Sequence, residues 1–168
     1  GDIRQLVLEA HEPFDVIHGR NILMHIPERE ALVHQLMQLL TPRGVAVLEV
    51  GDVSVTAPRP GPEADLFTRV LAAVHAYAES QGVALNAAES VFRALQRYDI
   101  LERWPVTTLD SSDAAHREYL AMTYESMRSG VVGVPAADYA RFLRLVRSAS
   151  WAGPVVWGIA ARRCQTTS

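Results

Sequence analysis

Residues 12–52 read EPFDVIHGRNILMHIPEREALVHQLMQLLTPRGVAVLEVGD, and this stretch decides the fold. Residues 14–18 form a short β-branched run behind a proline, which predicts a buried strand. Pro27 and the glutamates after it predict a helix start, and apolar residues at helical spacing continue the pattern to Leu40. Residues 45–50 form a second, nearly continuous apolar run. The stretch therefore predicts a strand, a helix and a second strand.

Two strands that are apolar on both faces and joined by a helix are typical of a parallel α/β sheet covered by helices. Residues 41–44, Thr-Pro-Arg-Gly, have turn chemistry and are expected to stop the helix. Such crossovers are almost always right-handed, so both strands end at the same edge of the sheet. Polar residues gather at these two ends, namely His18, Arg20, Asn21, His25, Glu49 and Asp52. We therefore expect a ligand crevice at this carboxyl edge.

The rest of the chain predicts more helices and two further strands. Helical patterns cover residues 66–78, 87–98 and 111–130, and another begins at Pro135; strands are expected at 103–109 and 155–161. Residues 57–62, APRPGP, predict a stiff loop. The segment between the last two strands is far longer than a hairpin turn of ~2–5 residues. We therefore expect residues 111–150 to form a helical lid or substrate insert.

Composition narrows the class of protein. The chain has 168 residues, 49% of them hydrophobic, and a formal net charge of −3, which fits one domain and disfavours nucleic acid or anionic membrane as a partner. The single Cys164 excludes an internal disulfide and a zinc site built from several thiolates. No apolar run reaches the ~18 residues of a membrane helix. We expect a cytoplasmic protein, and its sixteen basic residues, all arginine, indicate GC-rich coding and a bacterial source.

Three segments follow one another in an order and spacing that resemble a known family. They are GDI at 1–3, FDVIHGRNILMHI at 14–26 and LMQLLTPRGVAVLEV at 36–50. Together they resemble the second half of a class I S-adenosylmethionine-dependent methyltransferase, and the last two strands extend the resemblance to Arg163. It implies a truncated Rossmann-like sheet with a helical insert before the last strand. It also implies that the complete parent protein transfers a methyl group from S-adenosyl-L-methionine to a small organic acceptor, with O-, N- and C-methylation all left open.

The resemblance implies cofactor contacts by matched position. Asp2 corresponds to the acidic residue that meets the adenine amino group, and Ile3 to the apolar wall beside the same ring. Gly19 and Arg20 fall where the family touches the methionine part or the ribose of the cofactor. Leu23 lies in the loop that closes over the cofactor. Two of these positions also have a structural interpretation: Asp2 as a frayed terminal residue and Arg20 as a solvated loop charge.

The same resemblance, together with side-chain chemistry, gives catalytic and substrate candidates. His25 is the best base if the acceptor must lose a proton, because an imidazole titrates near neutrality, and Glu49 could assist it. Asp52 is placed to orient an amine or a hydroxyl of the substrate. An aromatic and methionine group in the predicted insert could form a pocket wall, although core packing is the more frequent role of such residues; this group includes Tyr119, Met122 and Tyr124.

The chain also departs from the family. The glycine-rich first loop and the acidic residue that binds the ribose both precede the GDI position, and this sequence contains neither. We therefore expect a single partial domain over residues 1–168. The alternative is a non-catalytic nucleotide-binding or regulatory domain. A nicotinamide-dependent oxidoreductase is disfavoured because G-x-G-x-x-G is missing. The spacing of the histidines does not favour a metal-binding site. If the protein forms an oligomer, we expect a homodimer.

Overall fold

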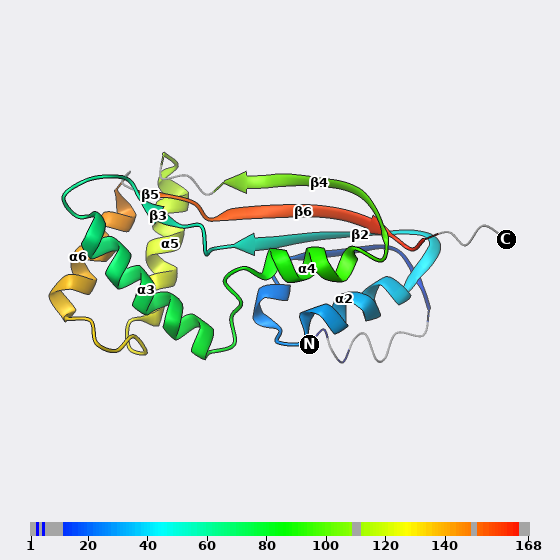
Figure 1. Cartoon of the computed structure of the whole chain (residues 1–168), viewed down its shortest axis with the longest axis horizontal. Helices are drawn as coiled ribbons and strands as arrows, with labels where there is room; N and C mark the ends of the chain where they lie inside the picture. Colours follow the sequence, from blue (N-terminus) through cyan, green and yellow to red (C-terminus); the bar gives the residue numbers. More distant parts are fainter. Residues whose placement is uncertain (1–2, 4, 6–11, 109–111, 149–150, 165–168) are drawn as a thin grey trace. The chain divides into compact units, whose positions relative to one another are not determined.

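The structure is a computed structural model that describes residues 3, 5, 12–108, 112–148 and 151–164 (Figure 1). The chain divides into two compact units. Unit 1 consists of Gly1–Asp52, Asn86–Thr107 and Val156–Ser168, and unit 2 consists of Val53–Leu85 and Thr108–Val155. Unit 2 is therefore inserted into the chain of unit 1 at two places, directly after Asp52 and directly before Val156.

Unit 1 is built on an open four-stranded sheet with the strand order β1-β2-β6-β4. The strands are β1 (Phe14–Arg20), β2 (Leu40–Asp52), β4 (Asp99–Thr108) and β6 (Val155–Arg162). β1 and β2 are parallel, and Arg20 pairs with Glu49 at their carboxyl ends. β6 runs in the opposite direction to β2 and β4 (Figure 1). The predicted fold, a truncated Rossmann-like sheet with a helical insert before its last strand, is confirmed.

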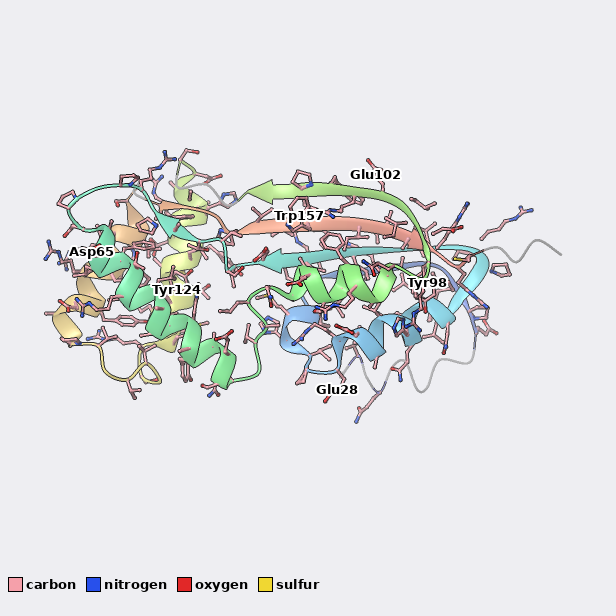
Figure 2. All side chains as sticks on the ribbon, viewed as in Figure 1. Glu28, Asp65, Tyr98, Glu102, Tyr124 and Trp157 are labelled. Atoms are coloured by element: carbon pink, nitrogen blue, oxygen red, sulfur yellow. The ribbon has the colours of Figure 1, made fainter. Side chains whose placement is uncertain are left out.

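Two helices of unit 1, α2 (Arg29–Gln38) and α4 (Ala87–Leu95), pack against each other and against β2. Alternate side chains of β2 are buried in this layer, namely Ala46, Leu48 and Val50. The helices add the fully buried Val33 and Leu95, and burying an aliphatic side chain of this size stabilises the fold by ~1.5–3 kcal/mol. His34 of α2 and Tyr98 lie with their rings 5.8 Å apart (Figure 2).

The predicted turn at residues 41–44 is wrong, because these residues belong to β2. α2 ends at Gln38, and Leu40 already pairs with Phe14. The step from Phe14 to Val16 in β1 then corresponds to the step from Leu40 to Val45 in β2, so the extra residues form an irregularity in the strand. Gly44 is required there, since a Cβ would lie 2.7 Å from the carbonyl oxygen of Phe14.

The prediction that residues 14–18 form a buried strand is also wrong. Phe14 and Val16 of β1 are 41% and 64% exposed. β1 stands at the end of the strand order, so β2 is its single neighbour among the described strands. Two other boundaries also differ from the prediction: α4 ends earlier, at Leu95, and β4 begins earlier, at Asp99.

Unit 2 contains the helices α3 (Ala64–Ser80), α5 (Ala114–Met127) and α6 (Ala136–Arg147). A short antiparallel ribbon of β3 (Ala57–Pro58) and β5 (Trp151–Ala152) accompanies them, so the predicted loop at residues 57–62 begins with a strand. The helices enclose an aromatic core in which Phe142 contacts Phe67, Tyr124 and Tyr139. The predicted insert, residues 111–150, falls within the range of this unit. Its residues 111, 149 and 150 lie outside the described residues. The role of this segment as a lid or substrate insert stays a prediction.

Ion pairs join the helices of unit 2 at their surface. Arg147 of α6 contacts both Glu118 and Glu125 of α5, at 3.0 and 3.2 Å. Arg69 of α3 contacts Asp138 of α6 at 2.9 Å. Because exposed pairs of this kind contribute ~0–1 kcal/mol each, the buried aromatic core is the main source of stability in this unit.

Gly153 follows β5 with φ +85°, and a Cβ there would lie 2.9 Å from the carbonyl oxygen of Val55. We expect Gly153→Ala to lower the free energy of unfolding by ~2–3 kcal/mol, through left-handed strain together with overlap. Gly133 has φ +77° with nothing within 4 Å of a Cβ, so Gly133→Ala shows the strain alone. Gly61→Ala, at an ordinary φ, is the neutral control. Urea unfolding measures all three, and equal losses for Gly153→Ala and Gly61→Ala would contradict the expectation.

His75 on α3 makes the stability of unit 2 depend on pH. Its Nε2 is buried without a hydrogen-bond partner among the described residues, and burial lowers its pKa, an effect that Glu79 partly offsets. The unfolded chain therefore binds the proton more readily than the folded one. Stability is full above about pH 6.5 and falls as the pH drops below this value, toward the folded pKa.

We therefore expect the Tm to fall between about pH 7.5 and about pH 5.5, and His75→Gln to reduce that fall. Burial also lowers the pKa of His34 in unit 1, with Arg97 adding to the effect and Glu30 opposing it, so part of the fall should remain in the variant. Thermal melts followed by circular dichroism at several pH values make the comparison. An identical pH dependence in the variant and the unchanged chain would show that His75 does not contribute.

Candidate functional site

The carboxyl ends of β1 and β2 carry a polar cluster, here called the edge cluster, made of His18, Arg20 and Glu49. Glu49 Oε1 accepts a hydrogen bond from His18 Nε2 at 3.0 Å, and its Oε2 lies 3.4 Å from Arg20 Nε. The Glu49 side chain is only 15% exposed, whereas both of its partners are exposed. The register explains the grouping, because Arg20 pairs with Glu49 and alternate residues of β1 share a face.

Asn21 follows β1 and fastens the two strand ends together. Its backbone N–H donates to the carbonyl oxygen of Glu49 at 2.8 Å. Its φ of 52° lies in the left-handed region, which asparagine tolerates better than most residues. The sequence pattern predicts Asn21 in the polar group at the strand ends but assigns it no role. The sequence does contain a signal for such a role, because an asparagine directly after a strand often marks a position where the chain turns.

The short helix η1 (Leu23–His25) holds two of the predicted site residues. The Leu23 side chain is buried in the core, and its carbonyl oxygen accepts a hydrogen bond from Arg29 Nε at 3.1 Å. His25 ends the helix and is exposed. Its imidazole is thus open to solvent. The cofactor role of Leu23 and the catalytic role of His25 stay predictions.

The remaining predicted site residues of unit 1 are the cofactor candidates Asp2, Ile3 and Gly19 and the substrate candidate Asp52. Asp2 is outside the described residues. Ile3 lines a hollow of about 220 Å³ that runs along β1, beside Phe14, Val16, Ile17, His18, Leu36 and Leu39. Gly19 lies within β1, where a Cβ would make an ordinary contact 3.5 Å from Leu48, so the glycine is not required by space. Asp52 is the last residue of β2 and is partly buried.

The predicted substrate residues of α5 do not form one wall within unit 2. Tyr124 is buried in the aromatic core, where burial raises the pKa of its hydroxyl, and its carbonyl oxygen accepts a hydrogen bond from the Tyr139 hydroxyl (Figure 2). Tyr119 and Met122 are exposed, one helical turn apart. Tyr124 therefore points away from the exposed face that carries Tyr119 and Met122, and the substrate roles of all three stay predictions.

In the part of the chain that the structure describes, no group of three or more His, Cys, Asp or Glu side chains is arranged to hold a metal ion. None of the described helices has the length and the apolar composition that crossing a membrane requires.

No protein-family model matches the chain, and no curated protein does either. Solved structures do match. They include the cyclase SpnF (14% identity, TM-score 0.47), with 95% of this chain aligned to 55% of that one. A coclaurine N-methyltransferase bound to N-methylheliamine and SAH has 14% identity and a TM-score of 0.49, with 92% and 48% of the two chains aligned. A cyclopropane synthase from Mycobacterium tuberculosis has 16% identity and a TM-score of 0.46, with 93% and 58% aligned.

The chain thus spans about half the length of these three structures. Several other matched structures are named methyltransferases, which is the class that the sequence resemblance also names. Identities and TM-scores this low concern the fold alone and do not establish a family. The function therefore rests on the residues of the edge cluster.

Proposed function

We propose that the chain is the C-terminal portion of an S-adenosyl-L-methionine-dependent methyltransferase that acts on a small organic acceptor. The observation that carries this proposal is the edge cluster of His18, Arg20 and Glu49. It lies at the carboxyl ends of two parallel strands, where open α/β sheets bind their ligands. The sequence resemblance implies cofactor contacts by Gly19 and Arg20 at this same edge.

The residues of the edge fit the cofactor's amino-acid part. The exposed guanidinium of Arg20 uses Nε toward Glu49, and its terminal N–H groups could bind a carboxylate. The side-chain oxygen of Asn21 is buried without a hydrogen-bond partner within the described residues, and it could accept a hydrogen bond from a ligand. When bound, S-adenosyl-L-methionine supplies a methyl group attached to a positively charged sulfur.

The chain's own contribution is mainly alignment. A direct displacement gains most of its rate from holding the two reactants in line. Glu49 orients Arg20 and His18, and in this proposal it is a positioning residue for both. In this proposal the exposed His25 takes the acceptor's proton where one must leave. Nothing in these residues selects among O-, N- and C-methylation.

The second candidate function is a non-catalytic nucleotide-binding or regulatory domain. It is favoured by one sequence observation, the lack of a glycine-rich loop that follows a strand. The two candidates differ in one measurable property. A methyltransferase transfers the methyl group to an acceptor, whereas a regulatory domain binds the cofactor and leaves it intact.

The proposal is tested by incubating the purified chain with radiolabelled S-adenosyl-L-methionine and a panel of phenols, primary amines and tertiary amines. We expect transfer to at least one class of acceptor. His25→Gln should lower kcat/KM for acceptors that lose a proton and leave it unchanged for a tertiary amine, which loses none. His116→Gln, on α5, is the matched control. Cofactor binding without transfer to any acceptor would favour the second candidate.

A further inference from the structure

Unit 2 contains a hollow of about 350 Å³. Pockets that hold small molecules commonly measure ~300–1,000 Å³. The hollow lies between the loop that joins β3 to α3, the start of α3 and one residue of α6 (Figure 1). Its described lining is mostly apolar, with Pro58, Pro60, Pro62, Ala64, Phe67 and Leu145. The hollow therefore has the size and the character of a binding site for a small molecule.

The walls of the hollow are held in place by the rest of unit 2. The three prolines fix their own φ angles. The loop is tied at both ends, because Pro58 pairs with Trp151 of β5 and the Ala64 N–H donates to the Gly61 carbonyl oxygen at 3.1 Å. The Phe67 ring is held in the buried aromatic core. A site that is already formed loses little conformational entropy when it binds a ligand.

These walls favour a flat aromatic ring. Proline rings present C–H groups, and the face of an aromatic ring carries negative charge density that attracts such groups. Phe67 adds an aromatic partner, with which a second ring can make an offset or edge-to-face contact. A flexible chain of similar size would lose more conformational entropy in the same space.

The polar groups of the lining favour a ligand that donates a hydrogen bond. Proline has no N–H, and the N–H groups of Ala64 and Phe67 already donate to the carbonyl oxygens of Gly61 and Glu63. The lining therefore offers acceptors more readily than donors. The carboxylate of Glu63 is the candidate acceptor. Its Oε1 accepts a hydrogen bond from Arg141 Nε, and its second oxygen, Oε2, can accept another.

The ion pair of Glu63 and Arg141 also bears on the charge of the ligand. The pair is neutral as a whole, so a charged ligand would gain little attraction there while it lost its hydration in an apolar hollow. We infer that the hollow binds a neutral aromatic ring that carries one N–H or O–H. The ring lies against the prolines and Phe67, and the donor group points to Glu63 Oε2. This binding does not depend on the proposed methyl transfer.

Indole and 1-methylindole test the ligand chemistry, because they share the ring system and differ in the N–H. Titrations that follow the proton NMR signals of each ligand should give a submillimolar Kd for indole, as expected for so small a molecule, and ~10-fold weaker binding of 1-methylindole. Glu63→Ala should weaken indole binding by ~10-fold and leave 1-methylindole binding unchanged. If the unchanged chain binds no indole, or binds both ligands equally well, the inference is overturned.

Filling the hollow tests where the ligand binds. Ala64→Leu adds an apolar side chain at the start of α3 and should abolish indole binding without lowering the Tm. Ala72→Leu, at an exposed position of the same helix, is the matched control and should bind indole as the unchanged chain does. Leu145→Phe fills the hollow from α6 and replaces the first variant if that one does not fold. Full indole binding by a folded hollow-filling variant, or an equal loss in Ala72→Leu, would overturn the inference.

Discussion

Phe142→Ala is expected to lower the free energy of unfolding of unit 2 by ~3–5 kcal/mol, which corresponds to a fall in Tm of ~10 °C. Phe142 is fully buried on α6, and its ring centroid lies 5.1 Å from that of Phe67, 5.5 Å from that of Tyr124 and 6.0 Å from that of Tyr139. Alanine would leave a cavity that three rigid rings cannot fill without changing their own packing.

Differential scanning calorimetry and hydrogen exchange read by mass spectrometry measure this effect. Exchange should rise in α3, α5 and α6 and stay unchanged in α2 and α4, because the two units have separate cores. Phe14→Ala, the same change at a half-exposed position of β1, is the control and should alter stability by less than ~1 kcal/mol. Similar losses in the two variants would contradict the assignment of Phe142 to the centre of the core.

Glu49→Gln is expected to weaken S-adenosylhomocysteine binding by ~10–100-fold, the range that one hydrogen bond to a charged group supports. The change keeps the size of the side chain and removes the charge that holds both His18 and Arg20. Arg20 would then lose its fixed orientation at the edge.

Titration calorimetry at constant pH measures the affinity, and the Tm of the variant shows whether it still folds. Glu102→Gln on β4 is the matched control, because Glu102 is an exposed glutamate in the same sheet. It should leave the affinity unchanged. An equal loss of affinity in both variants would indicate a general effect of net charge and contradict a specific role for Glu49.

The sequence predicts the sheet because its signals there are local. The apolar runs of residues 14–18 and 45–50 and the helix between them are all read from neighbouring residues, and the structure confirms this order. Residues 41–44 could not be assigned in the same way. Their turn chemistry is real, but pairing of Leu40 with Phe14 places them within a strand, and this pairing depends on tertiary structure.

The site was harder to predict because it depends on register and on strand order. The meeting of Arg20 with Glu49 follows from the irregularity at residues 41–44, which sets how the two strands align. The exposure of β1 follows from its place at the end of the sheet. In unit 2, by contrast, the helical period alone separates Tyr124 from Tyr119, so that part of the structure could have been predicted from the sequence.

The most direct test of the central claim, that the edge of β1 and β2 is a cofactor site, is a calorimetric titration of S-adenosylhomocysteine into the purified 168-residue chain. The account predicts saturable binding of one ligand per chain with a Kd in the micromolar range, equivalent to about −8 kcal/mol. Arg20→Ala should weaken it. A chain that is folded by circular dichroism and releases no binding heat over a range of temperatures would contradict the claim.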